Sequence, residues 1–297
     1  MKIGVVGLGS IGTRHAHNLG VLGHEVVSYD PCGGGTVRRE TAVYDSDVAG
    51  VVIATPSMFH EGPMRACIER GKHMLVEKPI STSVGMLPSL LERAKEKNLV
   101  VMMGNMLRFH PCVQWTAWRM SQINPKWASF ICSTLPSTQA DRDGVILNTG
   151  PHEVDIAMEL FGPAMVRSCI SERNGELTER TADFVLDHIS GVRSSFHIDI
   201  AADHRVREFT VSGEKGVIRC DLDQRKIWHR EETSESSTHF FGSYDVDYLQ
   251  EMRHFIRVIE RGGDAPAAMG HDGLATLKLL IELREKAGLE PEKRHIN

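Results

Sequence analysis

Short apolar runs alternate with amphipathic stretches through the first hundred residues of the chain. The apolar runs have the length and β-branched content of buried strands, and the stretches between them repeat apolar residues at helical spacing. The predicted strands are Ile3–Val6, Glu25–Tyr29, Gly50–Ala54, His73–Val76 and Leu99–Met103, and the predicted helices are Ile11–Leu22, His60–Arg70 and Val84–Lys97. Strands that alternate with helices over short links predict an α/β fold with a doubly wound parallel sheet.

Beyond Phe109 the pattern changes to short β-rich runs separated by polar turns. The runs are Trp127–Thr134, Ala182–Asp187, Gly191–Ile200, Arg207–Ser212, Gly216–Asp221 and Lys226–Arg230. Turns such as Ser190-Gly191 favour antiparallel hairpins. We therefore expect two domains, residues 1–108 and residues 109–297, the second an α+β domain with a largely antiparallel open sheet.

Four further segments complete the predicted organisation. Tyr244–Arg261 and Gly273–Ala287 show the apolar spacing of helices. Ser137–Gly144 and Glu231–Ser243 are polar, so we expect exposed loops there, either of which could act as a lid.

Composition narrows the class of protein without naming a function. The 297 residues are 41% hydrophobic and 25% charged, with a formal net charge of −5, so nothing favours nucleic acid or an anionic membrane. No apolar run approaches the roughly 20 residues of a membrane helix. The six cysteines are scattered without a C-x-x-C pair, which predicts reduced thiols, a cytoplasmic protein and no metal site. A signal peptide is not expected, because cleavage would remove the glycine motif near the start of the chain.

That motif reads G-x-G-x-x-G and lies between the first predicted strand and the first predicted helix. It consists of Gly7, Gly9 and Gly12. Glycines in this position allow a tight turn, a close approach to pyrophosphate and close helix packing, while the helix N-terminus offers free N–H groups. We expect a dinucleotide to contact Gly7, Gly9, Ser10, Ile11 and Gly12.

Asp30 closes the second predicted strand, 18 residues after Gly12. An acid about 20 residues beyond the glycines is the expected partner of the adenosine ribose hydroxyls, and it would repel a 2′-phosphate. The cofactor is therefore expected to be NAD rather than NADP, although Arg38 or Arg39 could receive such a phosphate. The alternative is that Asp30 only caps a turn.

Polar residues follow the ends of three predicted strands, where a doubly wound sheet binds its ligand. They are Thr55-Pro56, Glu77-Lys78-Pro79 and Gly104-Asn105. A lysine in such a crevice can donate a proton to a carbonyl oxygen if its pKa is lowered. The alternative for Lys78 is a solvated lysine at a strand end.

The chain resembles the Gfo/Idh/MocA family of nicotinamide-dependent oxidoreductases. The resemblance rests on the segments GLGSIGTRHAHNL, VVIATPSMFHEGPMRACIERGKHMLVEKPIS, GNMLRFHP and HEVDIAMELFG. It implies a Rossmann domain followed by an α+β domain, and hydride transfer between NAD(H) and a secondary alcohol or ketone. The implied substrate is a sugar, a sugar nucleotide or a cyclitol.

The same resemblance assigns roles to residues near the strand ends. It implies that Lys78 of the E-K-P motif, beside Glu77, touches both the nicotinamide ribose and the substrate. It implies that Thr55, Pro56 and His60 line the cofactor. Nicotinamide and substrate would meet at the residues of the G-x-N-x-R-F-x-P-like stretch, which are Asn105, Arg108, Phe109 and Pro111.

A second catalytic element resembles the family's D-x-x-x-H-x-x-D pattern, with His152 at the histidine and Asp155 at the last acid. An imidazole titrates near neutral pH and suits proton transfer, so His152 is a predicted catalytic and substrate-binding residue. Asn148 replaces the usual first aspartate, and an amide cannot accept a proton. Lys78 would then handle the proton alone while Asn148 binds substrate, or ketone reduction is preferred, or the chemistry is altered.

Some candidates have an equally simple structural interpretation. The guanidinium of Arg108 could recognise a carboxylate or phosphate, or form an ion pair that anchors the joint between the two domains. Asp155 could serve local structure, and His110 is a further candidate without an assigned role. Trp115 and Trp118 share a helical face, which favours packing in a core over stacking on a sugar.

The resemblance also implies that the C-terminal helices Tyr244–Arg261 and Gly273–Ala287 pack back on the first domain. It further implies a homodimer or homotetramer that forms through the sheet of the second domain. Two rival functions remain: a nucleotide-binding sensor with little activity, which Asn148 motivates, and a redox-neutral enzyme that holds NAD tightly.

Overall fold

The computed structural model describes all residues except 137–142, 174–177, 201, 232–233, 262–269 and 290–297. The chain forms two compact units. The first combines Met1–Phe109 with Ser243–Leu277, and the second combines His110–Gly242 with the chain from Lys278 onward.

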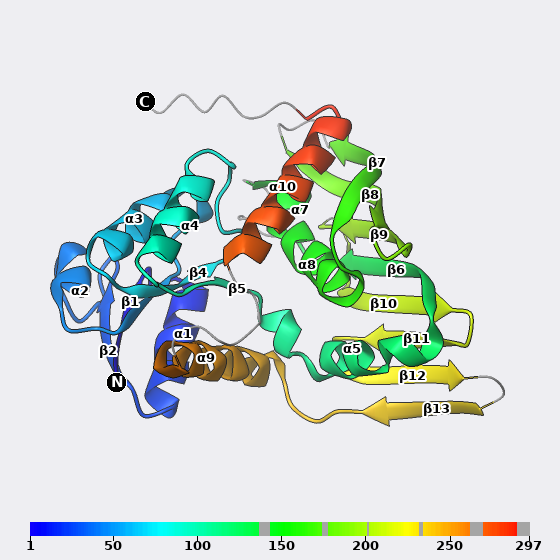
Figure 1. Cartoon of the computed structure of the whole chain (residues 1–297), viewed down its shortest axis with the longest axis horizontal. Coiled ribbons are helices and arrows are strands. Elements are labelled where there is room, and N and C mark those ends of the chain that lie inside the picture. The colour runs from blue at the N-terminus through cyan, green and yellow to red at the C-terminus, as the bar shows by residue number, and fades with distance from the viewer. Residues whose placement is uncertain (137–142, 174–177, 201, 232–233, 262–269, 290–297) are drawn as a thin grey trace. The chain divides into compact units, whose positions relative to one another are not determined.

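The first unit contains a five-stranded parallel sheet (Figure 1). Its strands lie in the order β2-β1-β3-β4-β5. Their bounds are β1 Lys2–Val6, β2 Glu25–Tyr29, β3 Gly50–Ile53, β4 His73–Glu77 and β5 Val101–Gly104. The order reverses between β1 and β3, and this switch point is where a doubly wound sheet binds its ligand. The predicted parallel sheet is confirmed.

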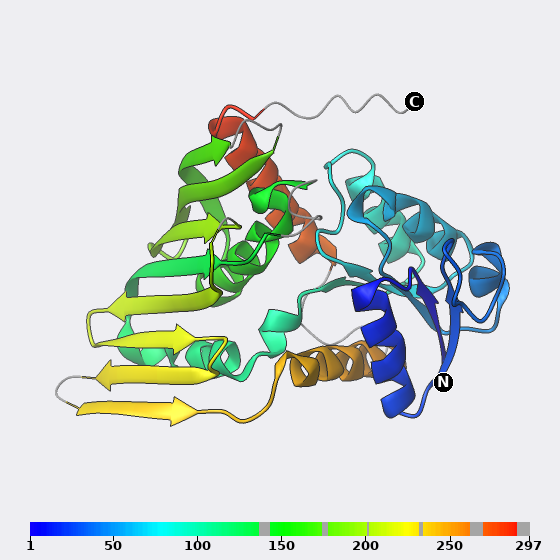
Figure 2. The ribbon, with the colours of Figure 1, turned by 180° about the vertical axis from the view of Figure 1, so that it is seen from behind.

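Helices cover both faces of this sheet, as Figure 2 shows from behind. One face is covered by α1 (Ser10–Val21) and α9 (Tyr244–Arg261), whose apolar residues join Ile3, Val5 and Val52 in one buried core. The other elements are α2 Thr41–Asp45, η1 Ser57–Phe59, α3 Glu61–Glu69, α4 Leu87–Glu96 and η2 Met106–Phe109. Helix α9 thus completes the first unit although it lies far along the chain.

The second unit contains an eight-stranded sheet in the order β13-β12-β11-β10-β6-β9-β8-β7. Strands β6 and β9 pair in parallel and the other neighbours pair antiparallel, which confirms the predicted, largely antiparallel open sheet. The bounds are β6 Pro125–Ser133, β7 Ala164–Arg173, β8 Glu179–His188, β9 Arg193–Asp199, β10 Val206–Gly213, β11 Gly216–Asp221, β12 Lys226–Glu231 and β13 Ser234–His239.

Helices cover one face of this sheet: α5 (Pro111–Ile123), α7 (Val145–Asn148) and α8 (Gly150–Phe161). Helix α10 (Gly270–Lys286) crosses the boundary between the two units at Leu277. Alternate strand residues point toward the helices and are buried, among them a stack of Phe130, Phe184, Phe196 and Phe209. The intervening strand residues occupy the opposite face and are largely half-exposed or exposed.

Three expectations about the second unit need correction or lie outside the described residues. Ser234–His239 is an edge strand and not a loop, because it needs only backbone pairing with β12 and buries almost no side chain. Trp118 is 65% exposed, so packing in a core is wrong for it, although its ring does contact Trp115. Most of the predicted loop Ser137–Gly144 lies outside the described residues.

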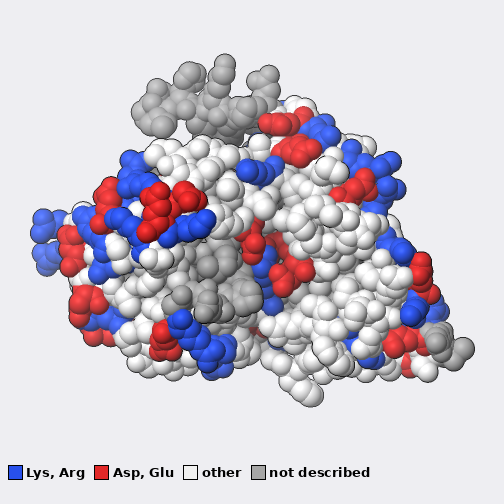
Figure 3. Space-filling view, in the orientation of Figure 1, with Lys and Arg blue, Asp and Glu red and all other residues white. Residues whose placement is uncertain are grey.

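Among the described helices, none combines the length and apolar character needed to cross a membrane. Lysine and arginine are interspersed with aspartate and glutamate over the face shown in Figure 3. This mixture agrees with the small net charge of −5.

Candidate active site

The glycine loop adopts a conformation that only glycine tolerates at two of its positions. Gly7 has a φ of +91°, and a Cβ there would lie 2.6 Å from the carbonyl oxygen of Ala54. A Cβ on Gly12 would overlap the carbonyl oxygen of Gly7. At Gly9, by contrast, nothing lies within 4 Å of an added Cβ, so its backbone is open to a ligand. Gly9 is also the N-cap of α1 and provides no side-chain cap to the helix N–H groups.

Asp30 lies directly beside this loop. Its Oδ2 accepts a hydrogen bond of 2.6 Å from the backbone N–H of Leu8, and its Oδ1 accepts one of 2.7 Å from Cys32. Asp30 is half-buried, and a carboxylate has lone pairs for further donors. Both the turn-capping interpretation and a role toward ribose hydroxyls therefore remain compatible with its position.

The imidazole of His60 connects the segments that follow β3 and β4. Its Nε2 lies 2.8 Å from the carbonyl oxygen of Thr55, and its Nδ1 lies 3.1 Å from that of Pro79. The imidazole is fully buried, and burial lowers its pKa although these carbonyls act in the opposite direction. His60 thus fixes the backbone of the turns that contain Thr55 and Lys78 through these two contacts.

Glu77 ends β4 and is buried against His15 of α1. The His15 Nε2 donates a hydrogen bond of 2.7 Å to Oε1 of Glu77, and the backbone N–H of Lys78 donates one of 3.1 Å to Oε2. Burial by itself raises the pKa of Glu77, but the hydrogen bond and charge of His15 and the charge of Lys78 outweigh it, so that pKa lies below its ordinary value. Lys78 follows at the carboxyl end of β4 and is half-buried.

Asn105 follows β5 and is only 1% exposed. Within the described part of the chain neither its amide nitrogen nor its amide oxygen has a hydrogen-bond partner, and the same holds for Oγ1 of Thr55. Buried polar groups normally have partners. These orphaned atoms at strand ends, with the open backbone at Gly9, fit a polar ligand such as a dinucleotide along this edge.

Arg108 forms an ion pair of 3.1 Å through its Nη1 with Asp272, and only 7% of its side chain is exposed. One interpretation of Arg108 was an ion pair that anchors the joint between the domains, whereas the observed pair joins two residues of the first unit.

Asn148 and His152 lie together in the second unit. Asn148 ends α7, Thr149 keeps helical backbone angles, and α8 begins at Gly150, so the two residues are four positions apart on a nearly continuous helical path. Both are half-buried, whereas Asp155 is buried.

Two buried carboxylates fix these helices to the sheet. Glu153 of α8 lies 3.1 Å from Nε of Arg207, and Glu179 accepts a hydrogen bond of 3.1 Å from the N–H of Ile146 at the start of α7. Burial raises the pKa of both glutamates, and the facing arginines only partly oppose it. Gly144 makes room for Glu179, because a Cβ there would overlap its carboxylate.

His110 has a structural role. Its Nδ1 accepts a hydrogen bond of 3.2 Å from the N–H of Cys112 at the start of α5, and its Nε2 lies 3.1 Å from the carbonyl oxygen of Leu222. Burial, together with the charges of Arg225 and Arg207, lowers the pKa of His110 to about 3. The imidazole is therefore neutral and donates through Nε2.

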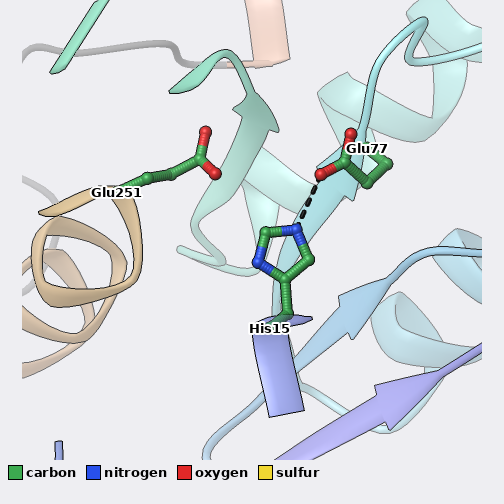
Figure 4. Close-up of side chains that lie close together, drawn as sticks. All are labelled: His15, Glu77 and Glu251. Carbon is green, nitrogen blue, oxygen red and sulfur yellow. Dashed lines mark hydrogen bonds and ion pairs between the residues drawn. The ribbon is translucent and has the colours of Figure 1, made fainter. Parts of the chain in front are cut away.

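The sequence pattern missed two residues beside Glu77. His15, Glu77 and Glu251 of α9 lie with their nitrogen and oxygen atoms within 4.8 Å of one another (Figure 4), the one such group of potential metal-binding residues among the residues that the structure describes. The 2.7 Å contact between His15 and Glu77 has the length of a charge-assisted hydrogen bond, whereas two ligands of one tetrahedral metal ion are about 3.4 Å apart. The available signal was His15, which shares a helix face with the apolar Ile11 and Leu19.

Two family models match the chain. Residues 37–105 match the model of an oxidoreductase family with an NAD-binding Rossmann fold, and residues 137–288, more than half of the chain, match the C-terminal alpha/beta domain of the same family. The chain belongs to the Gfo/Idh/MocA family of oxidoreductases. As a Gfo/Idh/MocA protein it is an NAD-dependent oxidoreductase, and the residues that match the Rossmann model lie in its first unit.

Individual relatives of this Gfo/Idh/MocA protein match it over its full length. A myo-inositol 2-dehydrogenase of Thermotoga maritima is 25% identical over 100% of this chain and 98% of its own. A 2,7-anhydro-N-acetylneuraminate hydratase of Escherichia coli is 28% identical over 100% of this chain and 89% of its own. The crystal structure of a UDP-N-acetylglucosamine 3-dehydrogenase from Acidithiobacillus ferrooxidans has the same fold, with a TM-score of 0.88, 17% identity and coverage of 97% and 98%.

Proposed function

We propose that the protein transfers a hydride between NAD(H) and a secondary alcohol or ketone of a sugar, a sugar nucleotide or a cyclitol. The names of the relatives support this substrate class, since they include dehydrogenases of myo-inositol and of UDP-N-acetylglucosamine. NAD(H), when bound, supplies or accepts the hydride. NADP(H) is the less favoured cofactor, because Asp30 stands beside the glycine loop.

Lys78 is the proposed proton-transfer residue. The observation that carries this role is its place at the carboxyl end of β4, next to an ionised Glu77 and on the sheet edge that also bears the glycine loop. In ketone reduction the Lys78 ammonium donates a proton to the carbonyl oxygen, and in alcohol oxidation the neutral amine accepts the hydroxyl proton.

The orphaned amide of Asn105 and the hydroxyl of Thr55 are proposed to bind the cofactor, together with Gly7, Gly9, Ser10, Ile11, Gly12, Asp30, Pro56 and the supporting His60 and Glu77. Asn105 can both donate and accept, which suits a ligand that carries hydroxyl and amide groups. Hydrogen bonds from the cofactor to this amide would recover the free energy that a buried, unpaired amide costs.

His152 is proposed to assist the proton transfer, and Asn148 to bind substrate. An amide at residue 148 cannot act as a base or stabilise an imidazolium as a carboxylate does. We therefore assign the main proton transfer to Lys78. Arg108 is proposed to contact the substrate while it keeps its ion pair with Asp272.

We further propose that the protein forms a homodimer or homotetramer through the uncovered face of the eight-stranded sheet. Trp127 and Ile131 of β6 and Ile170 of β7 are exposed on that face. Exposed apolar side chains of this size on one sheet face suit a protein interface.

Replacing Lys78 tests the proposal. Stopped-flow absorbance at the nicotinamide band, with a panel of sugars, sugar nucleotides, cyclitols and keto acids, should identify a substrate for the wild-type protein. Lys78→Ala should then reduce the single-turnover rate at least about 1,000-fold while NADH binding changes little. An unchanged rate would reject the assigned role of Lys78.

The hydratase among the relatives gives a second candidate, a redox-neutral reaction that uses tightly held NAD. Cofactor that co-purifies with the protein and never exchanges with added NADH would support this candidate. Nicotinamide absorbance that changes in a single turnover and stays changed supports the dehydrogenase instead.

A further inference from the structure

The chain folds back along β2 after that strand ends. Strand β2 lies at an edge of the parallel sheet (Figure 1). The N–H of Gly33 donates a hydrogen bond of 3.1 Å to the carbonyl oxygen of Asp30, and the N–H of Val37 donates one of 3.1 Å to that of Ser28. The partner's number falls as the donor's number rises, so this segment returns from the carboxyl end of β2 toward its amino end.

Glycines allow this sharp reversal. Gly33 and Gly34 have φ angles of +100° and +82°, in the left-handed region that favours glycine. A Cβ on Gly35 would lie 2.6 Å from the carbonyl oxygen of Ser28. The turn therefore brings the returning chain into close backbone contact with the edge of β2.

Two reciprocal hydrogen bonds between Ser28 and Thr36 fix the returning segment. The N–H of Ser28 donates to Oγ1 of Thr36 over 2.8 Å, and the N–H of Thr36 donates to Oγ of Ser28 over 3.2 Å. Ser28 is only 6% exposed, so loss of the Thr36 hydroxyl would leave the Ser28 N–H without its acceptor. Both side chains are thus needed to hold the segment in this place.

Beyond Thr36 the chain continues toward the amino end of the sheet. A Cβ on Gly4, in the middle of β1, would lie 2.6 Å from a methyl group of Val43, so α2 packs on the centre of that strand. Asp47 then forms an ion pair of 2.9 Å with Lys2, the first residue of β1. By residue 47 the chain has therefore reached the end of the sheet opposite the glycine loop.

Arg38 and Arg39 lie on this returning stretch, and both are exposed. They come directly after the segment that bonds to Ser28. Asp30 lies two residues further along β2, about 7 Å toward the glycine loop. The residues between Asp30 and the bonded segment, Pro31–Gly35, carry no charge. The two arginines are thus held on the side of Ser28 that faces away from Asp30.

We propose that the hydrogen bonds between Ser28 and Thr36 act with Asp30 to set the preference for NAD over NADP, because they hold Arg38 and Arg39 away from the adenosine ribose. A 2′-phosphate adds negative charge, and a guanidinium suits that group in charge and shape. This inference rests on the proposed preference for NAD. It adds that Thr36 is a positioning residue for two arginines that would otherwise favour NADP.

Removal of the arginines tests where they lie. NADH and NADPH are titrated against the protein by calorimetry at about 0.15 M salt, where charges farther apart than about 8 Å are largely screened. Arg38→Ala/Arg39→Ala changes only exposed side chains, so the protein should fold normally. The Kd of each nucleotide should stay within about twofold of its wild-type value.

Release of the segment should instead change the cofactor preference. Ser28→Ala/Thr36→Val removes both side-chain hydrogen bonds, so the arginines can move toward the phosphate. The Kd of NADPH should fall about 10-fold while that of NADH changes by less than about threefold. Addition of Arg38→Ala and Arg39→Ala to this variant should abolish the gain. Thr41→Val is the matched control, because Thr41 is exposed at the start of α2, and it should leave both Kd values unchanged.

Three results would overturn the inference. One is NADPH binding more than about twofold weaker in Arg38→Ala/Arg39→Ala protein, in which Ser28 and Thr36 are intact. Another is an unchanged ratio of NADPH to NADH affinity in folded Ser28→Ala/Thr36→Val protein, or in Thr36→Val alone if the double variant does not fold. The third is a gain in NADPH affinity that persists after both arginines are removed.

The inference and the proposed cofactor preference fail in different measurements. Wild-type protein that binds NADPH as tightly as NADH would remove the preference itself. A wild-type preference for NADH, with the same affinity ratio in Ser28→Ala/Thr36→Val, would reject only the role of these hydrogen bonds.

Discussion

Gly12 lies so close to Gly7 that a Cβ on Gly12 would overlap the Gly7 carbonyl oxygen. Packing therefore requires glycine at both positions in the turn between β1 and α1. A Cβ added to Gly9, between them, would have no atom within 4 Å, so packing does not require glycine at that position. Packing and ligand contact can thus be separated within one motif.

Gly9→Ala should leave the fold intact and weaken NADH binding at least about 10-fold, because the added methyl group enters the space that the pyrophosphate needs. Gly12→Ala should instead destabilise the protein by about 1–3 kcal/mol, because the methyl group overlaps backbone. Thermal melts and NADH titrations of both variants check this pair.

Gly20→Ala is the matched control on the same helix. Its Cβ meets nothing and the position is exposed, so the change should stabilise α1 by about 0.5–1 kcal/mol and leave NADH affinity unchanged. Normal NADH affinity in Gly9→Ala would contradict binding at the glycine loop.

Asp30→Ala should weaken NADH binding about 10-fold and narrow its advantage over NADPH. The change removes both the acceptor of the Leu8 N–H and the charge that repels a 2′-phosphate. Asp30→Asn separates the two effects, because an amide oxygen can still accept from Leu8 while the charge is lost. Equal selectivity in Asp30→Asn and the wild type would show that the carboxylate does not choose the cofactor.

His110 should make the folded protein less stable as the pH falls from about 6.5 toward 3. Its pKa is about 3 in the folded protein against an ordinary 6.5, so the unfolded chain binds a proton that the folded chain does not. From this residue alone, the free energy of unfolding should decrease by up to about 1.4 kcal/mol per pH unit. Burial raises the pKa of Glu153 and Glu179, so these carboxyls favour the folded protein as the pH falls and partly offset the effect of His110.

The difference between wild type and His110→Gln isolates this contribution. Urea unfolding at a series of pH values should give a flatter dependence for His110→Gln, while His17→Gln, at an exposed position of α1, should follow the wild type. Parallel curves for wild type and His110→Gln would contradict a buried neutral imidazole.

Ile131→Glu should lower the oligomeric state if copies pair through the uncovered sheet face. The substitution places a charge in the centre of that face, since β6 lies between β10 and β9. Ile189→Glu is the control, because Ile189 is 78% exposed but follows the end of β8 in a hairpin turn. Light scattering after gel filtration distinguishes the two, and an unchanged mass for Ile131→Glu would exclude this interface.

Local pattern was enough to predict the Rossmann sheet, since strand runs, glycines and polar strand ends each depend on a few neighbouring residues. Gly7, Asp30 and Asn105 lie at the strand ends where the pattern placed them. The same logic predicted the antiparallel hairpins of the second unit.

What the pattern missed depends on contacts between distant segments. Ser234–His239 forms a strand because it pairs with the edge of β12. The side chains of Ser234–His239 show no strand pattern that would predict this pairing. The meeting of His15 with Glu251 requires α9 to pack on α1, across more than two hundred residues. Trp118 follows the spacing of a buried face, yet it is 65% exposed and its ring contacts only near neighbours such as Trp115 and Arg119.

Calorimetric titration of the folded protein with NADH tests the central claim most directly. The structure predicts that one NADH binds per chain, that NADPH binds more weakly, and that Gly9→Ala loses affinity without losing stability. No measurable uptake of either nucleotide by protein with a cooperative thermal melt would contradict the account.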